Sequence, residues 1–436
     1  MRKRSKNACM TIKDLTPQSE WEVELSGEDH AWLESIARLE PEQFLLTDQP
    51  PHRQSKNKPM FEPILDRDLH GWRTGRYIGE IHHQGRTLHI KPRLEIDTIA
   101  DWLSAIHNVQ IVPEAADRSH GNQSLIIQLA AALWRAVIAQ AGSHSLAKQK
   151  IRRSTTGLQI KGNLDGAATS RLRATGYPGV VSTMKQNTLV SPTNAAIVAA
   201  DRVLNSKMGN PMWRGQRISD QLGHLRKAVG ANPKLPSRAQ LSRVRYTPIT
   251  MKWREAAELS HRIASNRLLK HTAKSSATYG LLIDVAELWE RFVLHCAAEA
   301  TAENVVHGTA DSLRQHLLHS EVVPVKGMGR LYPDVLIGPS PDHASARAVI
   351  DAKYKPLVDP RGVDREDLYQ LHAYSQSFRS TKALLAYPMI EASPSSPELN
   401  GPWSSPGGAQ LEFLRLPIRR EECITFLRSW FRSDED

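Results

Sequence analysis

Ala348-Val-Ile-Asp-Ala-Lys353 and, shortly before it, Leu331-Tyr-Pro-Asp334 carry the strongest structural signal in this chain. Apolar, β-prone residues lead into Asp351, and 16 residues separate that aspartate from Asp334. Because side chains alternate along a strand, Asp351 and Lys353 are expected to point the same way. If the strands that carry Asp334 and Asp351 pair as a hairpin, the two carboxylates converge on one site.

Two carboxylates at close range repel each other unless a cation lies between them. Mg²⁺ or Mn²⁺ is the ion that oxygen ligands and phosphodiester hydrolysis favour. Lys353 would then orient or help deprotonate the attacking water, or stabilise the pentavalent transition state as a fixed positive charge. The alternative is an ordinary solvent-facing pair on a strand, which the apolar neighbours of both aspartates disfavour because buried charge is costly.

The residues around this motif alternate between helical and strand patterns from 279 to 431. We expect the order α-β-β-β-α-β-β-α. The expected elements are a helix at Tyr279–Thr301, strands near Glu321–Val325, at Leu331–Ile337 and at Ala348–Tyr354, a helix at Asp364–Phe378, strands at Ala383–Tyr387 and Leu411–Leu416, and a helix at Glu421–Phe431.

Three segments of this half resemble the nuclease domain of the McrC family, the partner subunit of McrBC modification-dependent restriction systems. They are Tyr332-Pro-Asp334, Val349-Ile-Asp-Ala-Lys-Tyr-Lys355 and Asp367-Leu-Tyr-Gln-Leu-His-Ala-Tyr374. The resemblance implies an α/β fold, with a C-terminal PD-(D/E)xK restriction-endonuclease-like domain built on an α-β-β-β-α-β core. It also implies that Asp334, Asp351 and Lys353 are catalytic and that the two aspartates bind Mg²⁺ or Mn²⁺.

The helix after the catalytic strand contains Gln370 and Tyr374, which resemble the Q-x-x-x-Y signature of RecB-like nucleases. Four residues apart, they share a helix face. Gln370 would approach the active centre, and Tyr374 would support it, touch DNA or simply pack the helix. In the helix before the strands, Glu290 resembles the family's acidic position and is a further candidate metal ligand; Glu287 is its rival, and an ordinary surface glutamate is the other alternative.

The resemblance extends upstream to about residue 70. Gly75-Arg-Tyr-Ile-Gly79 and Leu88-His-Ile-Lys-Pro92 are similar to the β-rich N-terminal module of McrC proteins, and Thr188–Asn194 is similar to their middle region. In that family the N-terminal part docks into a ring of the AAA+ GTPase McrB and stimulates its hydrolysis, which implies such a partner here. The sequence has no G-x-x-x-x-G-K-[S/T] motif, so we expect this chain to bind no nucleotide itself.

The domain organisation expected from these patterns has three parts. Residues 1–120 form a β-rich partner-docking module with strands at 76–81 and 86–92, preceded by a linker rich in proline and polar residues around 50–59. Residues 121–275 form a basic, mainly helical region with helices at Ser124–Ala141 and Thr193–Leu204. Residues 276–436 form the nuclease domain.

Positive charge is concentrated in the middle region. The chain has 57 Lys and Arg against 46 acidic residues, and residues 142–245 hold 18 of the former and three of the latter. Such a stretch favours a polyanion, here DNA, although a solvated surface is the alternative. The expected phosphate contacts are Arg171, Arg173, Arg214, Arg217, Arg226, Lys227, Arg243, Arg245 and, beside the catalytic motif, Lys355.

The remaining composition excludes several classes. Cys9, Cys296 and Cys423 show no disulfide or zinc spacing, and no run approaches the roughly 20 apolar residues of a membrane span, so we expect a cytoplasmic protein without membrane contact. The leading hypothesis is a DNA endonuclease subunit of a type IV restriction system. The alternatives are a regulator or scaffold of an AAA+ NTPase with a secondary nuclease site, and a free-standing nuclease acting on DNA or RNA.

Overall fold

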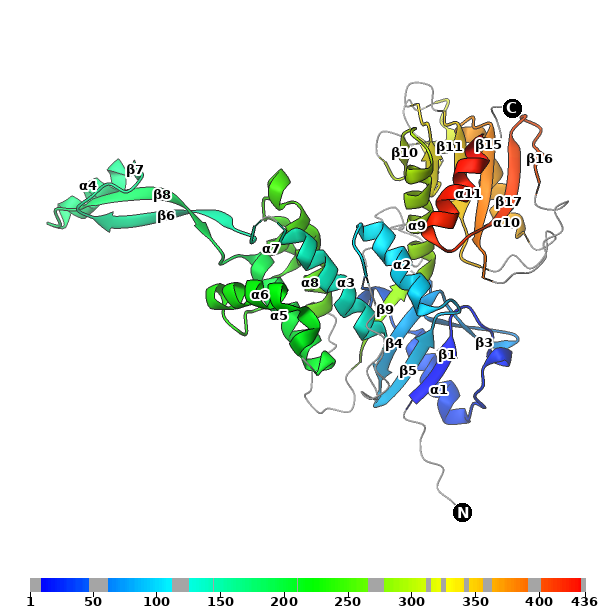
Figure 1. Cartoon of the computed structure of the whole chain (residues 1–436), viewed down its shortest axis with the longest axis horizontal. Coiled ribbons are helices and arrows are strands. Elements are labelled where there is room, and N and C mark those ends of the chain that lie inside the picture. Colours follow the sequence, from blue (N-terminus) through cyan, green and yellow to red (C-terminus); the bar gives the residue numbers. More distant parts are fainter. Residues whose placement is uncertain are drawn as a thin grey trace, which may run out of the picture. The chain divides into compact units, whose positions relative to one another are not determined.

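The chain folds into two compact units, which are treated separately below (Figure 1). The structure, a computed structural model, describes residues 9–46, 62–111, 125–143, 145–209, 211–265, 278–310, 315–322, 327–340, 345–355, 363–390 and 401–432. The core unit comprises Met1–Leu133 and Lys270–Asp436, and the inserted unit comprises Trp134–Leu269. The expected linker around residues 50–59 lies outside the described residues.

The first sheet of the core unit joins segments from both ends of the chain. Its order is β1 (Cys9–Lys13), β5 (Arg86–Lys91), β4 (Tyr77–His83) and β9 (Tyr279–Asp284), with β1 parallel to β5 and the other pairs antiparallel. The β4–β5 hairpin confirms the two strands predicted near residues 76–92. The first six residues of the helix predicted at 279–301 instead form β9, so that part of the prediction is wrong.

Strand β9 can pair with β4 because Gly79 leaves room for it. Gly79 has a positive φ of 138°, and a Cβ at this position would lie 2.0 Å from the carbonyl oxygen of Leu281. Any larger residue would force the strands apart. Helix α1 (Gly27–Ala37), which begins with a capping box between Ser26 and Asp29, and the hairpin of β2 (Leu65–Asp68) and β3 (Gly71–Thr74) complete the hydrophobic cluster of this sheet.

The second sheet of the core unit positions the candidate site. Its order is β10 (Val305–Val306), β13 (Val335–Ile337), β14 (Ala348–Ala352), β15 (Lys382–Pro388), β17 (Gln410–Leu416) and β16 (Trp403–Ser404). Strands β14, β15 and β17 are parallel, while β13 runs antiparallel to β14. The strands predicted at 331–337, 348–354, 383–387 and 411–416 are thereby confirmed, with shorter bounds for the first two.

Three helices cover the two faces of this sheet. Leu371 of α10 (Arg365–Ser377) packs against Ala383 and Leu385, which fixes the face that α10 covers. On the other face lie α9 (Val285–Ala300) and α11 (Arg420–Arg432), where Lys382 donates to the carbonyl of Trp430 in α11 at 3.0 Å. Helix α2 (Ile96–His107) packs on α9. The helices predicted at 364–378 and 421–431 are confirmed.

The strand predicted near Glu321–Val325 is not formed in its described part. Residues 321 and 322 are bends, and the rest of that segment lies outside the described residues. A small hairpin of β11 (His316–His319) and β12 (Gly327–Arg330) flanks it. None of the described helices is long and apolar enough to span a lipid bilayer.

The inserted unit combines a helical bundle with a long hairpin (Figure 1). Its helices are α3 (Leu125–Ala141, whose first part belongs to the core unit), α5 (Pro192–Met208), α6 (Gln216–Val229), α7 (Arg238–Ser242) and α8 (Lys252–Ser265). The predicted helices at 124–141 and 193–204 are confirmed apart from Ser124, which is not described. Trp134 of α3 donates to Ser260 of α8 at 2.8 Å and ties the bundle together.

The hairpin was not predicted from the sequence. Strands β6 (Gln149–Gly157) and β8 (Val180–Thr188) pair along their whole length, and β7 (Asn163–Leu164) and α4 (Gly166–Ala174) lie at its far end. Most of β6 is exposed on both faces, so the alternation of apolar and polar residues that reveals a half-buried strand is missing.

Candidate active site

Asp334 and Asp351 lie on the same face of the second sheet, at the ends of neighbouring antiparallel strands. Val335 pairs with Ile350 and Leu336 with Val349, so continuing this register places Asp334 directly opposite Asp351. Directly opposite residues on paired strands project to one side with closely spaced Cβ atoms. Asp334 Oδ2 also accepts a hydrogen bond from the backbone N–H of Ala352 at 2.7 Å. The predicted convergence of the two aspartates is therefore present in the structure.

Lys353 joins the two aspartates. Its Nζ lies 2.8 Å from Asp351 Oδ2 and donates to Gln370 Oε1 at 2.9 Å. Burial lowers the pKa of Lys353, but the carboxylates of Asp351 and Asp334 outweigh this effect and raise that pKa above its ordinary value. Lys353 is therefore a protonated ammonium at neutral pH.

Helix α10 supplies the residues that hold Lys353 from the other side. Gln370 donates through Nε2 to the Tyr374 hydroxyl at 2.8 Å, and that hydroxyl donates to the carbonyl of Tyr332 at 3.2 Å. Tyr374 is buried in a cluster with Leu336 and Val349. Among the alternatives for Tyr374, support of Gln370 and packing of the helix both fit this position, whereas a buried ring is poorly placed to touch DNA.

Glu290 contributes a third negative charge. It is buried on α9, and burial together with the Glu290 and Asp351 carboxylates raises the pKa of Asp334 well above its ordinary value. Lys353 and the Ala352 N–H oppose this rise. Glu287, one turn earlier, faces Arg291 with its Oε1 at 3.4 Å from Nε. Of the two glutamates, Glu290 is therefore the one whose carboxylate acts electrostatically on Asp334.

These carboxylates are not a preformed three-ligand metal site. In the described part of the chain, no group of three His, Cys, Asp or Glu side chains is arranged to hold a metal ion. Two carboxylates nevertheless suffice for Mg²⁺, which keeps several waters and is completed by substrate phosphate. The Glu290 and Asp351 carboxylates both repel the Asp334 carboxylate, and a cation would offset this repulsion.

Asp367 is a member of this cluster that the sequence analysis missed. Its Oδ1 lies 3.7 Å from Lys353 Nζ, and its Oδ2 forms an ion pair with Lys355. Lys355 also pairs with Asp364. Asp367 precedes Gln370 by three residues, so the helical spacing that linked Gln370 to Tyr374 could have identified it. Lys355, predicted to contact DNA, is held by acidic neighbours in this structure.

The predicted phosphate contacts of the inserted unit fall into two groups. Six are exposed, namely Arg171, Arg173, Arg217, Lys227, Arg243 and Arg245. Arg214 is buried and forms an ion pair with the buried Asp201, so its assignment as a phosphate contact is corrected to a structural one. The exposed Arg217 donates to the carbonyls of Gly142 and Ser143 at 3.3 and 3.4 Å, whereas Arg226 joins Arg214 in an ion pair with Asp201. A buried carboxylate requires such partners.

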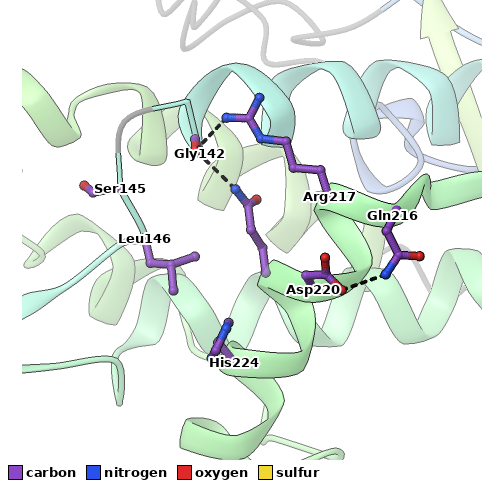
Figure 2. Close-up of a pocket in the computed structure, with 8 residues that line it drawn as sticks. Gly142, Ser145, Leu146, Gln216, Arg217, Asp220 and His224 are labelled. Atoms are coloured by element: carbon purple, nitrogen blue, oxygen red, sulfur yellow. Dashed lines mark hydrogen bonds between the residues drawn. The ribbon is translucent and has the colours of Figure 1, made fainter.

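A cavity of about 610 Å³ lies beside Arg217 in the inserted unit (Figure 2). Arg217 and Gln221 of α6 both reach the carbonyl of Gly142, and Gln216 donates to Asp220 at 2.8 Å. The side chains of this cavity thus mostly satisfy one another or the backbone. It carries none of the residues predicted to be catalytic.

The fold and the buried acidic cluster define a mixed α/β protein with a polar centre at the ends of β13 and β14. The family model of the McrBC 5-methylcytosine restriction system component matches residues 72–388, which is most of the chain. The chain belongs to this family, and the resemblance to McrC is confirmed. No curated protein matches the sequence.

Two solved structures from Thermococcus gammatolerans are similar. One is a refined half-complex from the tetradecameric assembly of McrB AAA+ hexamers with bound McrC, with a TM-score of 0.58 and 13% identity over 98% of this chain and 99% of that chain. The other is the McrBC complex, with a TM-score of 0.43 and 13% identity over 68% of this chain and 89% of that chain. The first similarity supports a shared fold over nearly the whole length.

Proposed function

We propose that this chain is a McrC-like nuclease subunit of a modification-dependent restriction system and that its second sheet is the core of a PD-(D/E)xK domain. The convergence of Asp334, Asp351 and Lys353 on one face of β13 and β14 carries this proposal. Within the second sheet and its helices, the succession α9-β10-β13-β14-α10-β15 agrees with the α-β-β-β-α-β core that the sequence resemblance implies. Membership of the McrBC family supports a role in restriction.

Mg²⁺ or Mn²⁺ fits the donor set of this cluster. Asp334 and Asp351 would hold the ion, and Glu290 would add negative charge near it. When bound, the ion lowers the pKa of a coordinated water and neutralises charge that builds up on the phosphate. Burial contributes most to the raised pKa of Asp334, and the Glu290 and Asp351 carboxylates add to it; a bound cation would offset the repulsion from these carboxylates.

The protonated Lys353 is suited to act as a fixed positive charge. Its raised pKa favours stabilising the negative charge of the transition state over removing a proton from water. Gln370 fixes the direction of Nζ through its Oε1, and the Tyr374 hydroxyl fixes the Gln370 amide. This chain of hydrogen bonds places the charge without further rearrangement.

Alanine substitution tests the assignment. Asp351→Ala and Lys353→Ala should each reduce Mg²⁺-dependent DNA cleavage by about 10²-fold or more, the effect of removing one preorganised charge or ligand. Glu366→Gln, an exposed change on α10, is the matched control and should cut at the wild-type rate. Full cutting by both alanine variants would refute the site.

The family resemblance implies that an AAA+ GTPase ring works with this chain, and the half-complex of McrB hexamers with bound McrC supports that partner. The β-rich N-terminal module is the docking surface that the resemblance implies. The end of the β6–β8 hairpin is a second candidate, because Leu158, Ile160 and Leu164 are exposed there. Exposed apolar side chains gathered in one place are typical of protein contacts.

The two alternative functions give different results in one assay. If GTP turnover by the partner is stimulated equally by wild-type protein and Asp351→Ala, regulation and cleavage are separable activities of one chain. Stimulation with no cleavage by the wild-type protein would favour the regulator or scaffold. Cleavage of DNA or RNA without partner and nucleotide would favour the free-standing nuclease.

A further inference from the structure

Tyr354, the residue after Lys353, is held by residues from the N-terminal part of the core unit. Successive side chains of an extended segment point to opposite sides, so Tyr354 faces away from the carboxylate cluster that Lys353 enters. The guanidinium of Arg93 lies 5.1 Å from the Tyr354 ring centroid, and the Trp102 ring meets it edge-on at 6.3 Å. Tyr354 is buried, and burial together with the Asp14 carboxylate raises the pKa of Tyr354; its hydroxyl makes no other hydrogen bond within the described residues.

The buried Asp14 pairs with the partly buried Arg93 at the ends of two parallel strands, with Arg93 Nε 3.8 Å from Asp14 Oδ1. Asp14 follows β1 and Arg93 follows β5, and the Arg93 backbone N–H donates to Asp14 Oδ1 at 2.7 Å. Asp14 is fully buried, and Arg93 Nη2 makes no hydrogen bond within the described residues. Burying such charges costs free energy that the pairing alone seldom recovers. The Arg93 guanidinium of this pair also lies over the Tyr354 ring.

The same N-terminal part also supports the helix that carries Glu290. Trp102 of α2 packs against Trp289 and Phe292 of α9, with ring centroids 5.1 and 5.4 Å apart. Trp289 Nε1 donates to the Ala386 carbonyl at 3.1 Å, and the Lys353 backbone N–H donates to the same oxygen at 2.8 Å. The backbone of Lys353 and helix α9 therefore meet at one acceptor behind the acidic cluster.

We propose that Asp14 and Arg93 are positioning residues of the nuclease centre, which act through Tyr354 to fix the backbone of Lys353 and thereby the location of its Nζ. This inference rests on the proposed nuclease function and adds a structural link from the N-terminal module to it. Misplacing a catalytic group by about 1 Å can cost about 10²-fold in rate. Through the same contacts, a change in the partner-docking module would alter the position of Lys353.

The test combines two conservative substitutions. Tyr354→Phe keeps the ring and removes the hydroxyl, while Asp14→Asn keeps the shape and removes the charge. In the full-length protein with its AAA+ GTPase partner, Mg²⁺ and DNA, each should lower kcat about ten-fold with an unchanged KM for DNA, on the scale set by small misplacements. The double variant should be no slower than the slower single variant, because both changes break one contact.

Glu80→Gln is the control for a general loss of stability. Glu80 is buried in β4 of the same sheet and pairs with His89 at 2.9 Å, but it makes no contact with Tyr354 among the described interactions. It should leave kcat unchanged. Additive losses in the double variant, wild-type kcat in folded Tyr354→Phe, or an equal loss in Glu80→Gln would overturn the proposal.

Hydrogen exchange separates this proposal from the proposed function. The amide of Lys353 is bonded to Ala386, and Asp14→Asn should speed exchange of peptides covering residues 352–354 about ten-fold, equivalent to about 1.4 kcal/mol of local protection. Unchanged exchange would overturn the link even if the wild-type protein cuts DNA. Faster exchange in a protein that never cuts DNA would retain the link and reject the nuclease.

Discussion

Replacing Asp334 by asparagine should stabilise the metal-free protein while abolishing its cleavage activity. The side chain is buried among Glu290 and Asp351, and burial together with these carboxylates raises the pKa of Asp334. Asparagine has nearly the same shape, and its Oδ1 can still accept the Ala352 N–H that Asp334 Oδ2 accepts at 2.7 Å. The substitution therefore removes the repulsion and keeps the hydrogen bond.

The size and pH dependence of this effect follow from linkage. A carboxyl group whose pKa is raised by folding favours the folded state below its unfolded pKa, and this contribution is lost as the pH rises through the folded pKa. Each pKa unit by which folding raises the pKa lowers the free energy of unfolding by about 1.4 kcal/mol at higher pH. In a unit of this size, 1 kcal/mol corresponds to about 2 °C in Tm. Asp334→Asn should thus raise Tm at pH 7.5 by at least about 2 °C, and the gain should shrink towards pH 4.

Thermal unfolding in EDTA and in Mg²⁺ provides the assay. Mg²⁺ at about 100 times its Kd should stabilise the wild-type protein by about 2.7 kcal/mol and should have little effect on Asp334→Asn. Asp364→Asn, which changes an exposed carboxylate outside the aspartate pair, should respond to Mg²⁺ as the wild type does. A lower Tm for Asp334→Asn in EDTA, or equal Mg²⁺ responses, would refute the reasoning.

Three further outcomes are expected. Tyr374→Phe should lower kcat about five-fold in steady-state cleavage kinetics, because losing one hydrogen bond to Gln370 is worth about 1 kcal/mol. A loss as large as that of Lys353→Ala would contradict a supporting role. Arg214→Ala should destabilise the inserted unit by about 3–5 kcal/mol in urea unfolding, because it leaves Asp201 buried with one partner fewer. Arg171→Ala should instead leave the stability unchanged and weaken binding to DNA in a salt-dependent manner. Leu158→Ser with Ile160→Ser should reduce stimulation of the partner GTPase with unchanged Tm; full stimulation would exclude the hairpin end as a docking surface.

The strands that carry Asp334 and Asp351 could be predicted because their signals are local. Apolar residues before Asp351 and the i, i+2 spacing to Lys353 fix the strand and its face, and the short separation from Asp334 favours an antiparallel neighbour. The helical spacing of Gln370 and Tyr374 likewise predicts their shared direction. These features need no knowledge of distant parts of the chain.

Strand β9 escaped prediction because its apolar run continues into the apolar residues of α9. Leu281 to Ile283 read equally well as buried strand or buried helix. The boundary signal was nevertheless present: Asp284 caps α9 by accepting from the Glu287 N–H at 3.1 Å, the D-x-x-E pattern of a helix start. Pairing with β4, almost 200 residues earlier in the chain, has no local signature.

Two groups of charged residues lie on opposite sides of the chain at the end of β14, and they have different consequences for the fold. On one side, Lys353 pairs with Asp351, which lies opposite Asp334. On the other, Arg93 pairs with Asp14 and lies over the Tyr354 ring. Hydrolysis by two carboxylates and a lysine requires only the first group. The second group, together with the contribution of β9 to the N-terminal sheet, joins the residues before the inserted unit to those after it in one folding unit. We therefore expect substitutions in the N-terminal half to alter the proposed nuclease centre through the contacts of Arg93 with Tyr354 and of Trp102 with Trp289.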